Sequence, residues 1–129
     1  MTGTSSAPSV GTILLVEDDG VSRHLVETIL EPHGYDLHFA GNGPKAIELA
    51  CDRLPDLILM DLNLPGMNGC ETIEVLKSRP ETAEIPVVAL TAHAAGDERR
   101  RAMEAGCEGY MVKPIDTRSF AQRLRQFMQ

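Results

Sequence analysis

The stretch LILMDLNLPGMNG, residues 57–69, decides the fold of this chain. Its first four residues, Leu57–Met60, are apolar and run directly into Asp61, which is followed by a loop containing proline, glycine and asparagine. An apolar run of this length, bounded by polar and turn residues, indicates a strand that is buried on both faces, as in a parallel sheet.

Three other apolar runs end in polar residues in the same way. They are Ile13–Val16 before Glu17, Asp18 and Asp19, then Pro86–Leu90 before Thr91, and Tyr110–Val112 before Lys113 and Pro114. Ligands of an open parallel sheet lie just beyond the carboxyl ends of its strands. We therefore expect the acids, the hydroxyl and the amine at these four strand ends to meet in one pocket.

Helical patterns alternate with the strands. Apolar residues recur at helical spacing from Val21 to Leu30, and the alternating strand Tyr35–Phe39 that follows is expected at the sheet edge. Four more helices are expected: one opening at Asn42-Gly43-Pro44, one capped by Asn68 with Glu71, one over Gly96–Ala105 and one capped by Asp116. Short connections between five strand–helix units predict an α/β fold, a (βα)5 doubly wound parallel sheet of five strands with helices on both faces.

The charge is unevenly distributed along the chain. The formal net charge is −7, and residues 1–63 hold ten acids and three bases, whereas residues 64–129 hold nine of each. An acidic half suits a cation better than a nucleic-acid backbone, which needs a basic surface. We therefore predict no direct contact with nucleic acid.

The length of 129 residues predicts one domain, with residues 1–10 as a disordered lead-in and residues 11–129 as the folded part. The lead-in is small, polar and uncharged, unlike a signal peptide or a membrane anchor. No apolar stretch approaches the ~20 residues needed to cross a bilayer. The three cysteines, Cys51, Cys70 and Cys107, lack CxxC spacing, which favours reduced thiols and a cytoplasmic location.

Three acids predict a metal site. Glu17, Asp18 and Asp61 would stand within a few ångströms of one another, and at an effective dielectric of ~20 one like-charge pair at about 4 Å costs about 4 kcal/mol. A bound cation or a raised pKa is therefore required. Oxygen ligands select a hard ion, and a few carboxylates combined with water and phosphate fit Mg²⁺ better than Ca²⁺.

Asp61 is the best candidate nucleophile because it stands alone at its strand end, which leaves Glu17 and Asp18 to the metal. A carboxylate beside Mg²⁺, an amine and a hydroxyl can attack phosphorus and form an acyl phosphate. Lys113 and the metal would neutralise the charge on the transferred group, and the Thr91 hydroxyl would hydrogen-bond one of its oxygens.

Together these motifs resemble the receiver domain of two-component response regulators, the CheY-like superfamily. The resemblance rests on Glu17-Asp18, on Asp61 in LILMDLNLPGMNG, on Thr91-Ala92 in PVVALTA and on Lys113-Pro114 in GYMVKPI. It implies a flavodoxin-like sheet of strand order 2-1-3-4-5 and a cis bond between Lys113 and Pro114. It also implies these roles: Asp61 as phosphoacceptor, Glu17, Asp18, Asp61 and the backbone of Asn63 around Mg²⁺, Thr91 and Lys113 on the phosphoryl group, and Tyr110 as the switch aromatic.

The resemblance implies a phosphoacceptor protein of a two-component system or phosphorelay, and not a turnover enzyme. A sensor histidine kinase or a histidine phosphotransfer protein would supply the phosphoryl group in the cytoplasm, with no membrane involved. The signal would leave a monomer or weak dimer through the face of the fourth helix, fifth strand and fifth helix, toward a downstream protein. Stand-alone receivers of the DivK kind are most similar, and a receiver domain cut from a hybrid histidine kinase or a larger regulator is the alternative.

Two other classes fit the residues less well. A small phosphatase of the haloacid-dehalogenase type also uses Asp, Thr or Ser, Lys and acidic metal ligands, but its nucleophilic DxD comes first and its metal pair last. Here Glu17-Asp18 precede Asp61, and Asn63 replaces the second Asp, the acid–base residue. A binding module that keeps the fold without phosphorylation would not need the intact acceptor, lysine and acidic pair.

Overall fold

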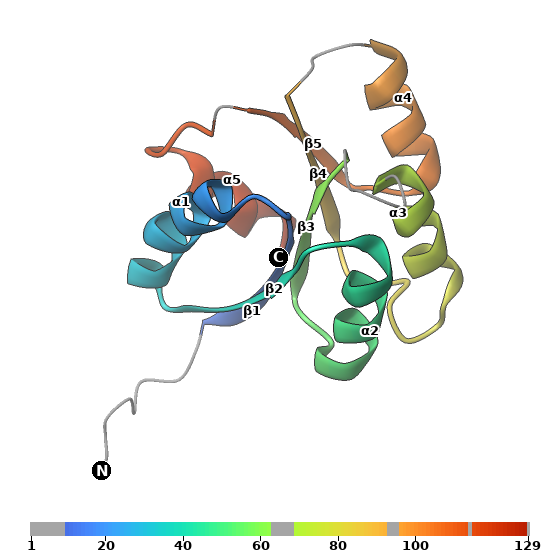
Figure 1. The fold of residues 1–129 in the computed structure, drawn as a ribbon, viewed down its shortest axis with the longest axis horizontal. Helices are drawn as coiled ribbons and strands as arrows, with labels where there is room; N and C mark the ends of the chain where they lie inside the picture. Colours follow the sequence, from blue (N-terminus) through green and yellow to red (C-terminus); the bar gives the residue numbers. More distant parts are fainter. Residues whose placement is uncertain (1–9, 63–68, 93–95, 114, 129) are drawn as a thin grey trace.

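The computed structural model describes residues 10–62, 69–92, 96–113 and 115–128. A five-stranded parallel sheet forms its centre (Figure 1), made of β1 (Gly11–Val16), β2 (Tyr35–Ala40), β3 (Leu57–Asp61), β4 (Val87–Thr91) and β5 (Gly109–Val112). The order β2-β1-β3-β4-β5 confirms the predicted flavodoxin-like order 2-1-3-4-5. The helices are α1 (Gly20–Leu30), the short 3-10 helix η1 (Glu31–His33), α2 (Gly43–Arg53), α3 (Gly69–Ser78), α4 (Gly96–Ala105) and α5 (Phe120–Phe127).

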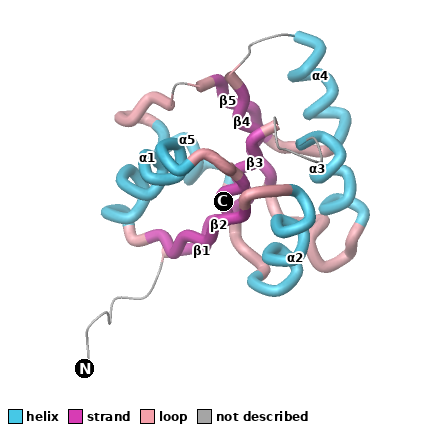
Figure 2. Tube along the Cα trace, viewed as in Figure 1, coloured by secondary structure: helices cyan, strands magenta, loops and turns pink. Residues whose placement is uncertain are grey.

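The helices cover both faces of the sheet, with α1 and α5 on one side and α2, α3 and α4 on the other (Figures 1 and 2). Neighbouring residues of one strand therefore enter different cores. Leu59 of β3 shares a core with Leu124 of α5, whereas Met60 shares the other core with Ile73 of α3. This burial on both faces explains why the central strands are continuous apolar runs rather than alternating ones.

The edge strand β2 differs from the central strands, as its alternating sequence predicts. Tyr35 and Ala40 at its ends are buried, whereas Asp36 is exposed. The strand pairs only with β1 in the part of the chain that the structure describes, so one edge faces solvent. The prediction of an edge strand over residues 35–39 is confirmed.

The helix starts agree with the sequence in part. Asn42 caps α2 by accepting a hydrogen bond from the Lys45 N–H at 2.8 Å, and α4 has the predicted bounds. The prediction that Asp116 caps the last helix is wrong, since α5 begins at Phe120. Asp116 instead closes the turn before the helix, where its Oδ1 accepts from the Arg118 N–H at 3.0 Å. Asn68, the predicted cap of α3, lies outside the described residues, as does nearly all of the predicted lead-in.

The start of α3 packs directly against the end of β3. The Gly69 N–H donates to the Leu62 carbonyl at 3.0 Å. A Cβ on Gly69 would lie 2.5 Å from Leu62 Cα and 2.8 Å from the Asp61 carbonyl oxygen. Only glycine allows this approach without movement of the backbone, so this position joins α3 closely to the strand that carries Asp61.

A half-buried lysine connects elements at the opposite end of the sheet. Lys77 Nζ, at the end of α3, donates to the carbonyls of Ala83 and Ile85 at 3.1 and 2.8 Å and to Glu108 Oε2 at 2.8 Å. Glu108 in turn exchanges two hydrogen bonds with Val87, one through its carboxylate and one through its backbone, both at 2.8 Å. The amino ends of β4 and β5 are therefore fixed to α3.

Candidate functional site

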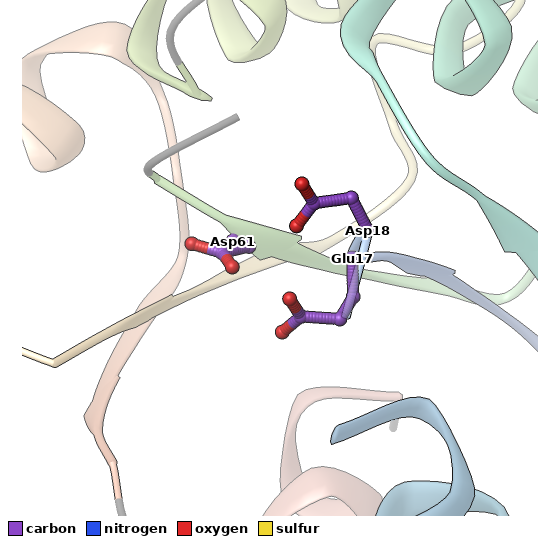
Figure 3. A group of neighbouring side chains, drawn as sticks. All are labelled: Glu17, Asp18 and Asp61. Atoms are coloured by element: carbon purple, nitrogen blue, oxygen red, sulfur yellow. The ribbon is translucent and has the colours of Figure 1, made fainter. Parts of the chain in front are cut away.

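Three carboxylates meet at the carboxyl ends of β1 and β3. Val16 pairs with Met60 in the sheet, so Glu17 and Asp61, the next residues along the two strands, are neighbours. One oxygen each of Glu17, Asp18 and Asp61 lies within 4.8 Å of the others. Figure 3 shows Asp61 on the end of β3 beside the two acids that follow β1. Glu17 and Asp61 are buried, whereas Asp18 is exposed.

Lys113, directly after β5, joins this group from the other side. Its Nζ donates to Glu17 Oε1 at 2.8 Å and to Asp61 Oδ2 at 3.3 Å. Its backbone N–H donates to the Thr91 carbonyl at 2.7 Å, which fixes the lysine against the end of β4. The sheet therefore brings together the predicted site residues Glu17, Asp18, Asp61, Thr91 and Lys113, at four strand ends.

The electrostatics of the cluster favour an additional cation. Burial raises the pKa of Glu17, an effect that the nearby Asp61 carboxylate adds to and Lys113 opposes. Burial alone would lower the pKa of Lys113, but its contacts with Glu17 and Asp61 raise it above the ordinary value. If all three carboxylates are ionised, the single Lys113 ammonium leaves two negative charges uncompensated.

The donor set fits Mg²⁺. All three candidate ligands are carboxylates, and hard oxygen donors in small number suit Mg²⁺, which keeps several waters. No histidine or cysteine belongs to this cluster among the described residues, so it lacks the ligands that zinc prefers. Asn63, expected to contribute its backbone, and the Lys113–Pro114 bond, expected to be cis, involve residues outside the described part of the chain.

Two further residues organise the start of α1. Asp19 caps that helix, since its Oδ2 accepts from the backbone N–H and hydroxyl of Ser22 at 2.9 and 3.0 Å. These hydrogen bonds lower the pKa of the Asp19 carboxyl. Arg23 Nε donates to the Glu17 carbonyl at 2.6 Å, and its guanidinium lies 5.7 Å from the centre of the Phe39 ring. Asp19 is thus engaged in capping, which leaves Asp18 as the exposed candidate ligand.

The Thr91 hydroxyl makes a contact that the sequence did not predict. It donates to Glu98 Oε1, in the first turn of α4, and the Tyr110 hydroxyl lies 3.5 Å from the same oxygen. Arg99 lies over the Tyr110 ring, 5.8 Å from its centre. The only sequence signal for Glu98 is an acid in the first turn of a helix, which is common in helices that have no such contact.

A small apolar cavity of about 200 Å³ adjoins the acidic site. Its lining residues are Glu17, Ser22, Leu25, Val26, Leu90, Lys113 and Ile115. Val21 and Leu25, on the helix beside it, are 78% and 38% exposed. Exposed apolar side chains beside this acidic cluster are suited to contact with another protein.

Known proteins are similar to this chain along most of its length. The family model described as the response regulator receiver domain matches residues 13–125. The polar-differentiation response regulator DivK of Brucella anthropi is 36% identical over 117 residues, which cover 91% of this chain and 95% of DivK. No helix among the described residues has the length and apolar character needed to span a membrane.

Two solved structures share the fold. The receiver domain of a sensor histidine kinase from Pseudomonas aeruginosa PAO1, with a magnesium ion coordinated in its active site cleft, is 30% identical with a TM-score of 0.85, over 92% of this chain and 97% of that one. The N-terminal receiver domain of Klebsiella pneumoniae RstA, activated with BeF3, is 28% identical with a TM-score of 0.84, over 92% and 98%.

Proposed function

This chain belongs to the response regulator receiver domain family, and on that basis we propose that Asp61 is its phosphoacceptor. The observation that carries the proposal is the buried Asp61 carboxylate at the end of β3, held between Lys113 and two further acids. The phosphoryl donor is a histidine kinase or a histidine phosphotransfer protein. The chain changes state when it is phosphorylated and does not turn over a substrate.

The chemistry is an in-line transfer to the Asp61 carboxylate. One of its oxygens forms a bond to phosphorus, and the P–N bond of the donor phosphohistidine breaks, so the imidazole leaves with the electron pair. When bound by Glu17, Asp18, Asp61 and the Asn63 backbone, Mg²⁺ supplies charge neutralisation at the phosphoryl oxygens. Lys113 holds the acceptor carboxylate in place before transfer and contacts the phosphoryl oxygens afterwards.

The apolar cavity beside the site provides the surface for the donor protein. Val21 and Leu25 of α1 are exposed next to it, and Ile115 is one of its lining residues. A partner that inserts an apolar side chain there would align its phosphohistidine with Asp61. This surface lies apart from the helices α3 and α4, so the donor leaves those helices accessible.

The output surface is the face formed by α4, β5 and α5. Tyr110 lies half-buried on the edge strand β5, in contact with Glu98 and Arg99 of α4. Phosphorylation draws the Thr91 hydroxyl toward Asp61, and Tyr110 then turns toward the space that Thr91 leaves. A downstream protein reads the changed packing of this face, and the chain acts in the cytoplasm as a monomer or weak dimer.

Two settings are compatible with this function. Similarity to DivK supports a receiver that acts by itself, and similarity to the receiver domain of a sensor histidine kinase supports one attached to a kinase. The chemistry at Asp61 is the same in both. The difference lies in whether the donor histidine belongs to another molecule or to the same protein.

The test is phosphorylation with acetyl phosphate and Mg²⁺, followed by intact-mass measurement. We expect one added phosphoryl group in the wild type and none in Asp61→Asn. Asp52→Asn is the matched control, because Asp52 lies exposed on α2 and pairs only loosely with Arg53 at 3.8 Å. Labelling of Asp61→Asn at the wild-type level would overturn the assignment.

A further inference from the structure

We propose that Glu98 is a positioning residue that holds the Thr91 hydroxyl in its unphosphorylated arrangement, so that activation requires the Thr91–Glu98 hydrogen bond to break. The inference rests on the proposed function, since it assigns a cost to the step in which Thr91 turns toward the phosphoryl group. Glu98 touches neither Asp61 nor the acidic cluster in any contact that the structure describes.

The argument begins with the hydrogen-bonding capacity of threonine. A hydroxyl has one proton to donate, so Thr91 cannot donate to Glu98 and to a phosphoryl oxygen at the same time. Its present acceptor is a carboxylate, and hydrogen bonds to ionised acceptors are stronger than those between neutral groups. The two acceptors, Glu98 and the phosphoryl group, therefore compete for the same proton.

The position of Glu98 connects the Thr91 contact to the start of α4 and to Tyr110. It lies in the first turn of α4, where a negative charge interacts well with the helix dipole. The same Oε1 lies 3.5 Å from the Tyr110 hydroxyl, so one carboxylate contacts both residues of the switch. Release of Thr91 thus changes the surroundings of Tyr110, on the surface that partners contact.

The Glu98 carboxylate can also be solvated after its hydrogen bond with Thr91 breaks. Glu98 lines a groove of about 320 Å³ between α3 and α4. Its other lining residues are Leu62, Cys70, Glu71, Glu74, Arg101 and Glu104. Glu98 is only half-buried, so water can solvate it once Thr91 leaves, and Arg101 is the basic residue of the same groove. The transition therefore leaves no buried charge without solvation.

The experiment measures the affinity of the Mg²⁺-loaded protein for beryllofluoride, a mimic of the phosphoryl group, by calorimetry. Glu98→Ala should bind about fivefold more tightly than the wild type, because Thr91 no longer leaves an acceptor when it turns. Glu98→Gln keeps an acceptor oxygen and should lie between the two. Asp97→Ala is the matched control, since it removes an acid from the same turn of α4 where the side chain pairs with Arg100.

A double variant separates positioning from a general effect. In the Thr91→Val background there is no hydroxyl to release, so Glu98→Ala should give no further gain in affinity. Unchanged or weaker binding by Glu98→Ala, an equal gain in Asp97→Ala, or a gain that persists with Thr91→Val would each overturn the inference. A wild type that fails to bind beryllofluoride, or Asp61→Asn binding equally well, would instead overturn the proposed phosphoacceptor.

Discussion

Replacement of Gly69 by alanine tests the contact between α3 and the end of β3. The new Cβ would meet Leu62 Cα at 2.5 Å and the Asp61 carbonyl oxygen at 2.8 Å, and both are backbone atoms that cannot rotate away. Ordinary contact would require the helix start to retreat by roughly 1 Å, a form of overpacking that costs about 1–3 kcal/mol. Replacing glycine by alanine also stabilises the protein by about 0.4–1 kcal/mol, because it reduces the conformational entropy of the unfolded chain. The net loss should be about 1–2 kcal/mol.

The measurement is urea and thermal unfolding followed by circular dichroism. For a chain of this size the expected loss corresponds to a fall in Tm of about 3–8 °C. Gly96→Ala is the control, because Gly96 also begins a helix but has no atom of the described residues within 4 Å of the added Cβ. That variant should be as stable as the wild type or slightly more stable. Equal shifts in the two variants would show that the close approach at Gly69 does not limit stability.

Three further predictions concern the site and one buried thiol. Asp18→Asn should weaken Mg²⁺ binding by about tenfold or more through the loss of one charged ligand. Asp19→Asn, which removes the same charge from the capping residue, should weaken Mg²⁺ binding less. Isothermal titration calorimetry with Mg²⁺ compares the two variants. Lys113→Arg should still accept phosphate but lose much of its response to phosphorylation, because the guanidinium is planar and larger, and amide exchange over residues 96–112 should then show little change on phosphorylation. Burial raises the pKa of Cys107 from 9.0 to about 11. The folded protein therefore keeps the thiol proton that the unfolded chain loses, and between about pH 9 and 11 stability should fall by up to about 1.4 kcal/mol per pH unit more in the wild type than in Cys107→Ala.

The sequence predicted the sheet and most of the site because both depend on local pattern. Each buried strand is a continuous apolar run, and in a parallel sheet the residue after such a run must lie at the common carboxyl edge. Glu17, Asp61 and Thr91 could therefore be placed together from the sequence alone. The alternation of apolar and polar residues over residues 35–39 likewise placed β2 at the edge of the sheet.

Other features depend on tertiary packing and had no local signal. Asp116 has the residue type of a helix cap, but the chain first makes a turn, so the helix starts four residues later. Asp19 follows Glu17 and Asp18 in a run of three acids, and its capping role depends on its hydrogen bonds to Ser22. The contact of Glu98 with Thr91 depends on how α4 lies over β4 and β5, which no spacing in the sequence encodes.

The Lys77–Glu108 contact has a mechanical consequence for α4. Gly106, directly after α4, lies against Lys77, since a Cβ there would be 2.8 Å from Lys77 Cγ, whereas the other end of the helix carries Glu98 in its first turn. A helix of this length spans about 15 Å, and its first turn is held through the Thr91–Glu98 hydrogen bond, which activation would break. We expect displacement to be largest around Gly96 and to vanish toward Ala105. A downstream protein that binds α4 near Ala105 would therefore bind the phosphorylated and unphosphorylated states with similar affinity. One that binds near Gly96 would discriminate between the two states.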